Sequence, residues 1–199
     1  MCRMFDLTAV CVVMSIAGAA YAQQCTCGTA KVQNGWCGDC KVGYFDAVKV
    51  KSRALFDALT GAEVKADEIK CASCKKALAS DGYCPDCRVG YVGKKKYTSH
   101  VAYVLAKGER KDPAAITCDS CKKNAADHGW CDSCKVGMVG NVAFKDKKAY
   151  DEAVEARRIL TAAAESKCEK CAVAMVTDGE CQECKVAYKD GKKTKIEKP

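Results

Sequence analysis

Sixteen of the 18 cysteines in this 199-residue chain recur in one spacing pattern. In each copy, two closely spaced cysteines are followed by nine residues and then by a pair of the form Cys-x-x-Cys. Four thiols brought together as two close pairs form the ligand set of a tetrahedral metal site. The sequence therefore predicts four metal sites, whose ligands are Cys25, Cys27, Cys37 and Cys40; Cys71, Cys74, Cys84 and Cys87; Cys118, Cys121, Cys131 and Cys134; and Cys168, Cys171, Cys181 and Cys184.

Disulfide bonds and iron are the alternative uses of these thiols. A disulfide within one Cys-x-x-Cys closes a very short loop and stabilises little. Disulfides between two pairs would stabilise more, but they do not require a strict Cys-x-x-Cys spacing. Iron stays open as the bound metal, because four tetrahedral sulfurs also suit it. Haem attachment and thioredoxin-like chemistry are disfavoured, since no pair is followed by His and no βαβ pattern surrounds any pair.

No signature of catalysis is present in the sequence. There is no catalytic triad, no carboxylate pair in a catalytic motif and no phosphate-binding loop. The two histidines, His100 and His128, are too few for a hydrolytic zinc site with an open coordination position. His128 takes a turn position that Asn or Asp holds in the other copies, so we predict that neither histidine is a ligand. We expect a protein that is not an enzyme.

The N-terminal segment, 1–22, has the pattern of a secretory signal. Its apolar stretch, 7–20, leads to the small-x-small sequence Ala20-Tyr21-Ala22, where we predict cleavage. That stretch is shorter than the roughly 20 apolar residues that a membrane-spanning helix needs. An uncleaved anchor or a buried N-terminal helix is the alternative. We expect export to the periplasm or the extracellular space, and no membrane span after cleavage.

The net charge of +8 has an explanation other than nucleic-acid binding. A divalent ion held by four thiolates carries a net charge of −2, so four such sites cancel the formal charge of the chain. Basic neighbours also lower thiol pKa values. Lysine or arginine closely follows a Cys-x-x-Cys at Lys41, Lys75, Lys76, Arg88, Lys122, Lys123, Lys135 and Lys185. We therefore expect no nucleic-acid partner, and instead a protein or envelope partner whose identity the sequence does not give.

The segments around the cysteines predict which elements position them. Asx-Gly pairs before the third ligand indicate a tight hairpin turn within the nine-residue loop, with the aromatic residue that follows lying against the metal knuckle. His-Gly stands at this place in the third copy. The pairs are Asn34-Gly35, Asp81-Gly82, His128-Gly129 and Asp178-Gly179.

A second hairpin and then a helix are predicted after the fourth ligand. Short apolar runs around a glycine-containing turn indicate the hairpin. Ser52, Ser99 and Asp146 follow their fourth ligands at one constant distance and are good N-caps for a helix. The third helix is predicted to be the longest, towards Ser166. The fourth copy lacks a helix, and we expect its lysine-rich end, 192–199, to be frayed.

The cysteine spacing resembles the short zinc-ribbon family, in which two Cys-x-x-Cys knuckles flank a tight hairpin and hold one zinc. The resemblance covers the four cysteine segments, each from its first to its fourth ligand, and leaves out the segments between them. Two departures stand out: Lys or Arg replaces the glycine that commonly follows a knuckle, and the first copy opens with Cys25-Thr26-Cys27. The resemblance implies about four structural zinc ions and no particular function.

These observations together predict a small, metal-stabilised α+β fold of four tandem zinc-ribbon-like modules. Each unit is short enough that a metal or disulfides usually supplement the core. We expect an exported binding or scaffold protein; metal buffering by the thiolates, and redox or electron transfer through iron or thiol-disulfide exchange, are the alternatives. The predicted segments are a signal peptide at 1–22 and repeats at 23–66, 67–113, 114–164 and 165–199.

Overall fold

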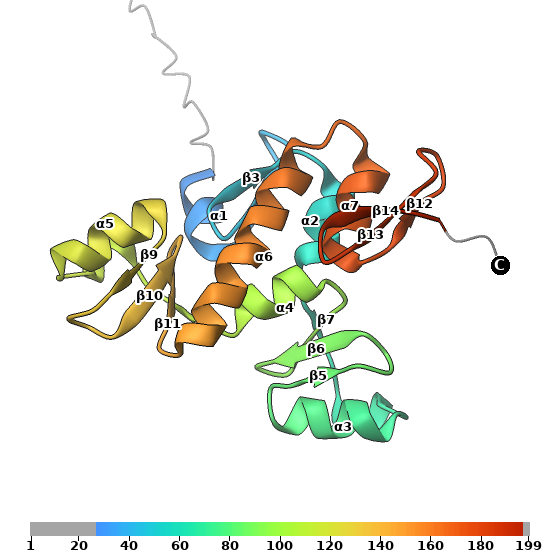
Figure 1. Cartoon of the computed structure of the whole chain (residues 1–199), viewed down its shortest axis with the longest axis horizontal. Coiled ribbons are helices and arrows are strands. Elements are labelled where there is room, and N and C mark those ends of the chain that lie inside the picture. Colours follow the sequence, from blue (N-terminus) through green and yellow to red (C-terminus); the bar gives the residue numbers. More distant parts are fainter. Residues whose placement is uncertain (1–26, 197–199) are drawn as a thin grey trace, which may run out of the picture.

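The computed structural model describes residues 27–196 of the chain. The predicted signal peptide at 1–22 and the predicted ligand Cys25 lie outside the described residues. The fold is α+β, with short strands in small antiparallel sheets and helices between them (Figure 1). Within residues 27–196, no helix is both long enough and apolar enough to cross a membrane.

Four antiparallel sheets hold the described strands. Every sheet contains a hairpin whose inner strand also pairs with the short strand that ends at the third cysteine of a group. In order of pairing, the sheets are β1 (Trp36–Cys37), β2 (Val42–Phe45) and β3 (Val48–Val50); β4 (Ala62–Glu63), β7 (Lys95–Tyr97), β6 (Val89–Val92) and β5 (Tyr83–Cys84); β8 (Glu109–Arg110), β11 (Val142–Phe144), β10 (Val136–Val139) and β9 (Gly129–Cys131); and β12 (Glu180–Cys181), β13 (Val186–Lys189) and β14 (Lys192–Lys195).

The hairpin predicted after each fourth cysteine is confirmed in all four sheets. In the first sheet the turn consists of Asp46 and Ala47, both with positive φ, a turn without glycine that the sequence pattern did not single out. The lysine-rich end is ordered further than predicted, because Lys192–Lys195 pairs with β13 along its whole length. The expectation of a frayed end is therefore wrong for these four residues.

The hairpin predicted within each nine-residue loop is wrong, because a helix occupies that segment. The helices are α1 (Cys27–Gln33), α3 (Ala72–Ala79), α5 (Asp119–Asp127) and α7 (Glu169–Thr177). The Asx-Gly pairs end these helices and do not turn a hairpin. Asp81 has a φ of 49°, and the N–H of Gly82 donates to the carbonyl of Ala77 at 2.8 Å. This bond spans five residues, as in the Schellman ending of a helix.

In three of the four copies the Asx side chain also connects the helix to the hairpin that follows. The carboxylate of Asp81 accepts a hydrogen bond from the N–H of Gly93 at 2.9 Å. Asn34 and Asp178 accept equivalent bonds from the N–H groups of Asp46 and Asp190, each at 2.7 Å. All three bonds span the same sequence separation and fix the distance between the end of the helix and the hairpin turn.

The three helices predicted after the hairpins are confirmed, together with their caps. They are α2 (Arg53–Leu59), α4 (His100–Ala106) and α6 (Lys147–Glu165). Ser52, Ser99 and Asp146 are their N-cap residues, and each side chain accepts a backbone N–H from the first turn of its helix. Two short 3₁₀ helices, η1 (Ala66–Glu68) and η2 (Pro113–Ala115), lead from β4 and β8 toward the next cysteine group.

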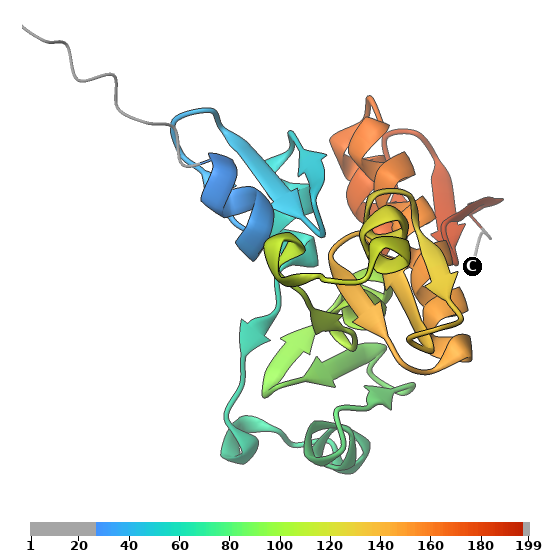
Figure 2. The ribbon, with the colours of Figure 1, turned by 90° about the vertical axis from the view of Figure 1, so that its left-hand side faces the viewer.

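One hydrophobic core joins helices from all parts of the described chain. It contains Leu59 of α2, Val104 of α4, Leu160 of α6 and Val176 of α7. The longest helix, α6, lies at the centre and contacts α4, α7, β3 and β10 (Figures 1 and 2). The predicted arrangement of four tandem modules is not confirmed, because helices of different repeats share this core; the predicted boundaries at 66, 113 and 164 stay predictions.

The sheets themselves cross those predicted boundaries. Strand β4 precedes residue 66 yet pairs with β7 of the following repeat. Strand β8 precedes residue 113 and pairs with β11 in the same way. Three smaller hydrophobic clusters, each built around cysteines, lie outside the shared core. Figures 1 and 2 show α3 with β5 and β6 projecting away from α6.

A buried ion pair connects the first hairpin to the central helix. Asp46 is fully buried, and its carboxylate and backbone carbonyl both accept hydrogen bonds from the guanidinium of Arg157 in α6. The second carboxylate oxygen, Oδ1, has no hydrogen-bond partner. Burial raises the pKa of Asp46 to about 6, against the opposing effect of Arg157 and, more weakly, Arg110.

Candidate metal centres

The structure brings the predicted ligands together in four separate clusters. In three of them, four sulfur atoms all lie within 4.8 Å of one another: Cys71, Cys74, Cys84 and Cys87; Cys118, Cys121, Cys131 and Cys134; and Cys168, Cys171, Cys181 and Cys184. The fourth cluster consists of Cys27, Cys37 and Cys40, and Cys25 lies outside the described residues. No disulfide joins any of the 15 described cysteines.

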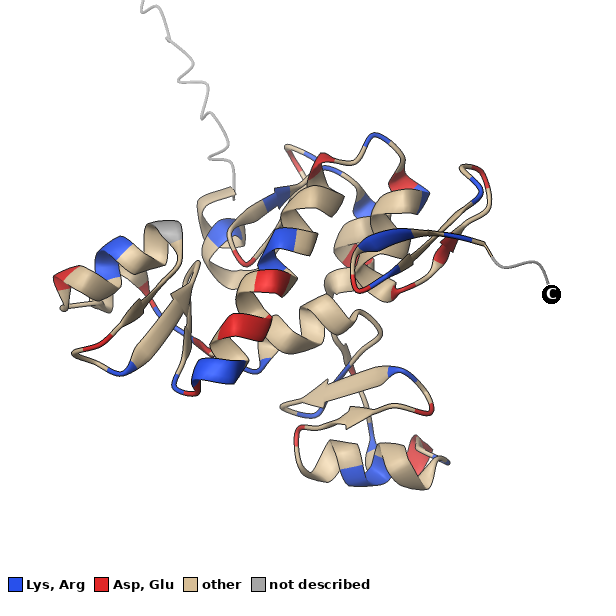
Figure 3. Ribbon diagram, in the orientation of Figure 1, with Lys and Arg blue, Asp and Glu red and all other residues tan. Residues whose placement is uncertain are grey.

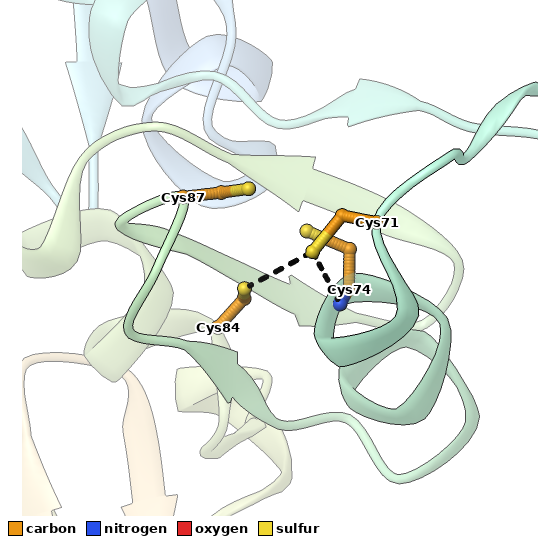
Figure 4. A group of neighbouring side chains, drawn as sticks. All are labelled: Cys71, Cys74, Cys84 and Cys87. Atoms are coloured by element: carbon orange, nitrogen blue, oxygen red, sulfur yellow. Dashed lines mark hydrogen bonds between the residues drawn. The ribbon is translucent and has the colours of Figure 1, made fainter.

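The spacing of the sulfurs fits one tetrahedral ion per cluster. The Sγ atoms of the first and third cysteines are 4.0 Å apart for Cys71 and Cys84, and 3.9 Å apart for Cys118 and Cys131. In the last cluster the corresponding distance is 3.8 Å. Four sulfurs about 2.3 Å from a zinc ion lie roughly 3.8 Å from each other. Figure 4 shows the four side chains of one cluster directed toward a common centre.

A helix N-terminus and a strand end position the two pairs of each four-cysteine cluster. Cys71 is the N-cap of α3, and its sulfur accepts the backbone N–H of Cys74 in the first helical turn. Cys168 caps α7 in the same way, and Cys118 precedes α5. Thiolates at this place are favoured by the N–H groups and the dipole of the helix. The first pair is therefore held by a helix and not by a ribbon hairpin.

The second pair lies in a tight turn between two strands. Cys84 ends β5 and Cys87 lies in the turn before β6. The residue after the fourth cysteine has a φ of 50–53° in every copy, at Lys41, Arg88, Lys135 and Lys185. This is the conformation for which glycine is common. Lys or Arg in place of the usual ribbon glycine therefore keeps the left-handed backbone of the second knuckle.

Burial differs within a cluster and follows the same order in all of them. In each four-cysteine cluster the first thiol is half-buried, the second and third are buried, and the fourth is exposed. In the first cluster Cys37 is buried and Cys40 is exposed. The cysteines themselves form much of the surrounding apolar packing: Cys171 and Cys181 lie with Val186 in one small cluster. Each four-cysteine cluster thus takes the place of a hydrophobic core for the helix and hairpin around it.

Backbone N–H groups make one thiol in each four-cysteine cluster distinctly acidic. The N–H of Cys74 lowers the pKa of Cys71 to about 7, and that of Cys171 lowers the pKa of Cys168 to about 7. In the third repeat the N–H of Cys134 lowers the pKa of Cys131 to about 6. Hydrogen bonding with neighbouring thiols raises the pKa of Cys87 and of Cys184 to about 12, and burial raises the pKa of Cys121 and of Cys171. Metal binding must displace the thiol protons, so its affinity falls as the pH falls.

Tyrosines of the hairpin contact the second cysteine in two clusters. The hydroxyl of Tyr188 donates a hydrogen bond to the sulfur of Cys171, and burial raises the pKa of this tyrosine to about 12. Tyr91 makes the same contact with Cys74, and its pKa is raised for the same reason. Sequence reasoning missed this role, although the pattern holds a signal for it: tyrosine recurs at one place after the basic residue of the turn, with Met138 in the third copy.

Side chains inside the knuckles also connect the two pairs directly. Ser73 donates a hydrogen bond to Asp86 at 2.8 Å, between the first and second pairs of the second cluster. Lys170 and Glu183 form an ion pair at 2.6 Å at the same two positions of the last cluster. Sequence spacing did not identify these contacts, because the partners are distant in sequence and only the folded knuckles bring them together.

The aromatic residues before the third cysteine face away from the metal sites, contrary to expectation. Trp36 packs against Phe56, with ring centroids 5.5 Å apart, and Trp130 against Tyr150 at 5.7 Å. Side chains alternate along a strand, so the cysteine faces its cluster while the preceding residue faces the shared core. His100 packs edge-on against Tyr83, which agrees with a packed role for that histidine.

The chain was also compared with known proteins. No protein family matches it, and no curated protein or solved structure is similar to it. The likeness to zinc ribbons therefore rests on the spacing of the cysteines and on the geometry of the four clusters.

Proposed function

We propose that this protein is an exported, non-enzymatic scaffold that holds four zinc ions in structural cysteine sites and displays its outer surface to a protein or envelope partner. The observation that carries the proposal is the clustering of cysteine sulfurs at tetrahedral spacing in place of a local hydrophobic core. Sites of this kind contribute their binding free energy directly to folding. Four thiolates also prefer zinc over harder ions.

The surface charge supports a protein partner over nucleic acid. Figure 3 shows Lys and Arg interspersed with Asp and Glu over most of the described elements. Exposed ion pairs also bring opposite charges together on the surface, as in Arg53 with Asp57 and Lys147 with Asp151. Protein surfaces that bind nucleic acid instead carry a continuous basic patch. The strand β14, with lysines at 192, 193 and 195, is the main basic exception and belongs to an exposed sheet edge, where lysine discourages strand pairing with other chains.

Native mass spectrometry of the protein, isolated from its own compartment without chelator, tests the metal sites. We expect a mass excess of four divalent ions, or of three if the first site is loose. A mass excess matching iron would move the proposal to electron transfer. A loss of 16 hydrogens, meaning eight disulfides, would overturn the metal sites altogether.

Metal buffering is the second candidate, and the exposed fourth cysteine in every cluster favours it. A buffer must release metal while its fold survives, whereas removal of a structural ion unfolds its site. We expect a weak chromophoric chelator to remove few ions within minutes, and a strong chelator to remove the ions and the helical circular-dichroism signal together. Rapid loss of several ions with the helices intact would favour buffering instead.

A further inference from the structure

A cavity that is lined by none of the cysteines lies where the first three predicted repeats meet. Its volume is about 270 Å³, and its walls come from the ends of α1, α2 and α4, the first hairpin, and the strands β7, β8 and β11. A volume of this size corresponds to roughly nine water-sized units, enough for a small organic molecule. Phe45, Leu105 and Val142 give the cavity an apolar wall.

Both charged side chains that line this cavity are basic, whereas Gln33, Asn34 and Thr60 supply neutral polar groups that can also accept hydrogen bonds. Arg110, Lys95 and Tyr97 line it, and among the described residues no Asp or Glu does. Arg110 lies opposite Val142 in the sheet, so both side chains share one face. The only hydrogen bond of its guanidinium among the described residues is a long one, 3.4 Å, to the carbonyl of Val32. Its remaining N–H groups are available to a ligand.

The hydroxyl of Tyr97 is the second donor. The ring is half-buried and packs closely on Gly61, where an added Cβ would lie 2.6 Å from the ring. Burial raises the pKa of Tyr97, and the nearby charge of Arg110 opposes that effect. The tyrosine therefore stays a neutral donor close to the guanidinium. No hydrogen bond of its hydroxyl is found among the described residues.

The acidic residues near this cavity are engaged elsewhere or lie outside it. Asp46 is buried beside it and is bound to Arg157. Glu109 pairs with Lys111, and Glu63 lies opposite Lys95 in the sheet without forming an ion pair with it. Because Glu63 offsets part of the charge of Lys95, Arg110 is the main positive group of the cavity.

From this arrangement we propose that the cavity binds a small organic carboxylate. The guanidinium of Arg110 holds the carboxylate oxygens, the Tyr97 hydroxyl donates to one of them, and the apolar wall holds the hydrocarbon part. A planar guanidinium matches a carboxylate through two parallel hydrogen bonds. The apolar wall favours an organic acid over inorganic phosphate, which would leave Phe45, Leu105 and Val142 unused.

Amide NMR titration of the full metal-loaded chain tests this site with three probes: benzoate, benzyl alcohol and inorganic phosphate. We expect benzoate to bind saturably and to shift the amides of Gly61, Tyr97 and Gly108. Benzyl alcohol, which has the ring without the charge, and phosphate should each bind roughly ten-fold more weakly or worse. Equal binding of benzyl alcohol, or shifts that scatter over surface lysines without saturation, would overturn the proposal.

Variants then test the assigned residues. Arg110→Gln should weaken benzoate binding by roughly ten-fold or more. Lys96→Gln is the matched control, because Lys96 lies between Lys95 and Tyr97 on β7 but does not line the cavity; it should change the affinity less than about two-fold. Equal effects of the two variants would refute the site.

A second variant keeps the proposal testable if Arg110→Gln does not fold. Ala106 lines the cavity at the end of α4, and Ala106→Leu fills the space without changing the charge. Leucine is a good helix former, so α4 should persist. We expect benzoate binding to be lost in this variant. Unchanged binding would place the ligand elsewhere and would contradict the proposal.

Discussion

At the scale of single residues, one glycine in each of the first three hairpins is required by the helix that follows. An added Cβ at Gly90 would lie 2.1 Å from the ring of Tyr103, and one at Gly137 equally close to Tyr150. In the fourth copy the corresponding residue is Ala187, and no helix follows it within the described chain. Glycine thus stands at this hairpin position where a helix packs against it, and alanine stands there where no helix follows.

Gly90→Ala should therefore destabilise the protein. The added methyl group cannot fit without moving the Tyr103 ring or the strand, and overpacking of this kind costs about 1–3 kcal/mol. Urea unfolding of the metal-loaded chain measures the effect.

Gly38→Ala serves as the matched control, because nothing lies within 4 Å of a Cβ added at Gly38. The same knuckle position is occupied by Pro85, Asp132 and Gln182 in the other copies. Its effect should stay within about 0.5 kcal/mol. Equal destabilisation by the two alanines would show that the contact between Gly90 and Tyr103 is not the cause.

The burial of Asp46 makes stability depend on pH in a definite direction. The pKa of Asp46 in the folded protein is about 6, above its ordinary value of 3.8. The folded state therefore binds the proton more tightly than the unfolded chain, and this contribution to stability is lost as the pH rises through 6. The facing charges, Arg157 and Arg110, reduce the shift without reversing it.

Asp46→Asn should remove this dependence. Asn keeps the shape of the side chain and tolerates the positive φ at this turn. Between pH 5 and pH 8 the parent protein should lose about 1 kcal/mol of unfolding free energy relative to the variant. Urea unfolding of both proteins at several pH values measures the difference between their unfolding free energies. The pH dependence of the metal sites cancels in this difference, because both proteins contain the same sites. A constant difference would contradict a raised pKa.

At the scale of elements, local signals in the sequence predicted the capped helices but not the helices inside the cysteine loops. Ser52, Ser99 and Asp146 act through bonds to the next few residues, so a short stretch of sequence is sufficient to identify them. The Asx-Gly pairs are ambiguous, because positive φ serves both a hairpin turn and a helix end. The residues at 75–79, which are alanine, leucine and lysine, favour a helix there. The Asx-Gly pair that follows them is therefore better interpreted as a helix end than as a hairpin turn.

These loop helices differ in what they contact, and this predicts different outcomes for the same substitution. Helix α3 packs in a small cluster with Cys84 and Tyr91, outside the shared core. Cys84→Ser combined with Cys87→Ser should release one metal ion and unfold α3 and β5, while α4 and α6 stay protected. Hydrogen exchange read by mass spectrometry distinguishes these elements.

The last cluster provides the comparison. Ala172 and Val176 of α7 are buried in the shared core, and α7 contacts α2, α4 and α6. Cys181→Ser combined with Cys184→Ser should therefore also release one ion, but weaken protection in α2 and α6 as well. Two outcomes would contradict the assignment of α3 and α7 to different hydrophobic clusters. In one, each double variant unfolds only the helix and hairpin around its own cysteines; in the other, both double variants unfold the whole chain.

At the scale of the whole molecule, the shared core was not predictable from the repeats. Each copy of the pattern predicts a local unit, and the aromatic residues Phe56, Tyr103 and Tyr150 indicate a common helix face. Which helices meet across that face depends on contacts between distant parts of the chain, such as the hydrogen bond at 2.7 Å from Ser99 to the carbonyl of Val176, far along the sequence. No local spacing encodes these contacts.

Leu160→Ala tests whether this core is one cooperative unit. Leu160 is fully buried in α6, at the centre of the core. Its truncation should cost about 2–5 kcal/mol of unfolding free energy through lost apolar contact and the cavity left behind. Because α6 contacts both α4 and α7, hydrogen exchange should accelerate in all three helices together, while native mass spectrometry should still find all the metal ions bound.

Leu78→Ala provides the same substitution outside the core. Leu78 is partly buried in the small cluster around α3, so its loss should accelerate exchange in α3 and leave α6 unchanged. A shared core predicts this contrast, because a perturbation spreads only through elements that pack together. If the effect of Leu160→Ala were confined to α6 and the ribbon beside it, the repeats would fold as independent modules, each held mainly by its own metal ion.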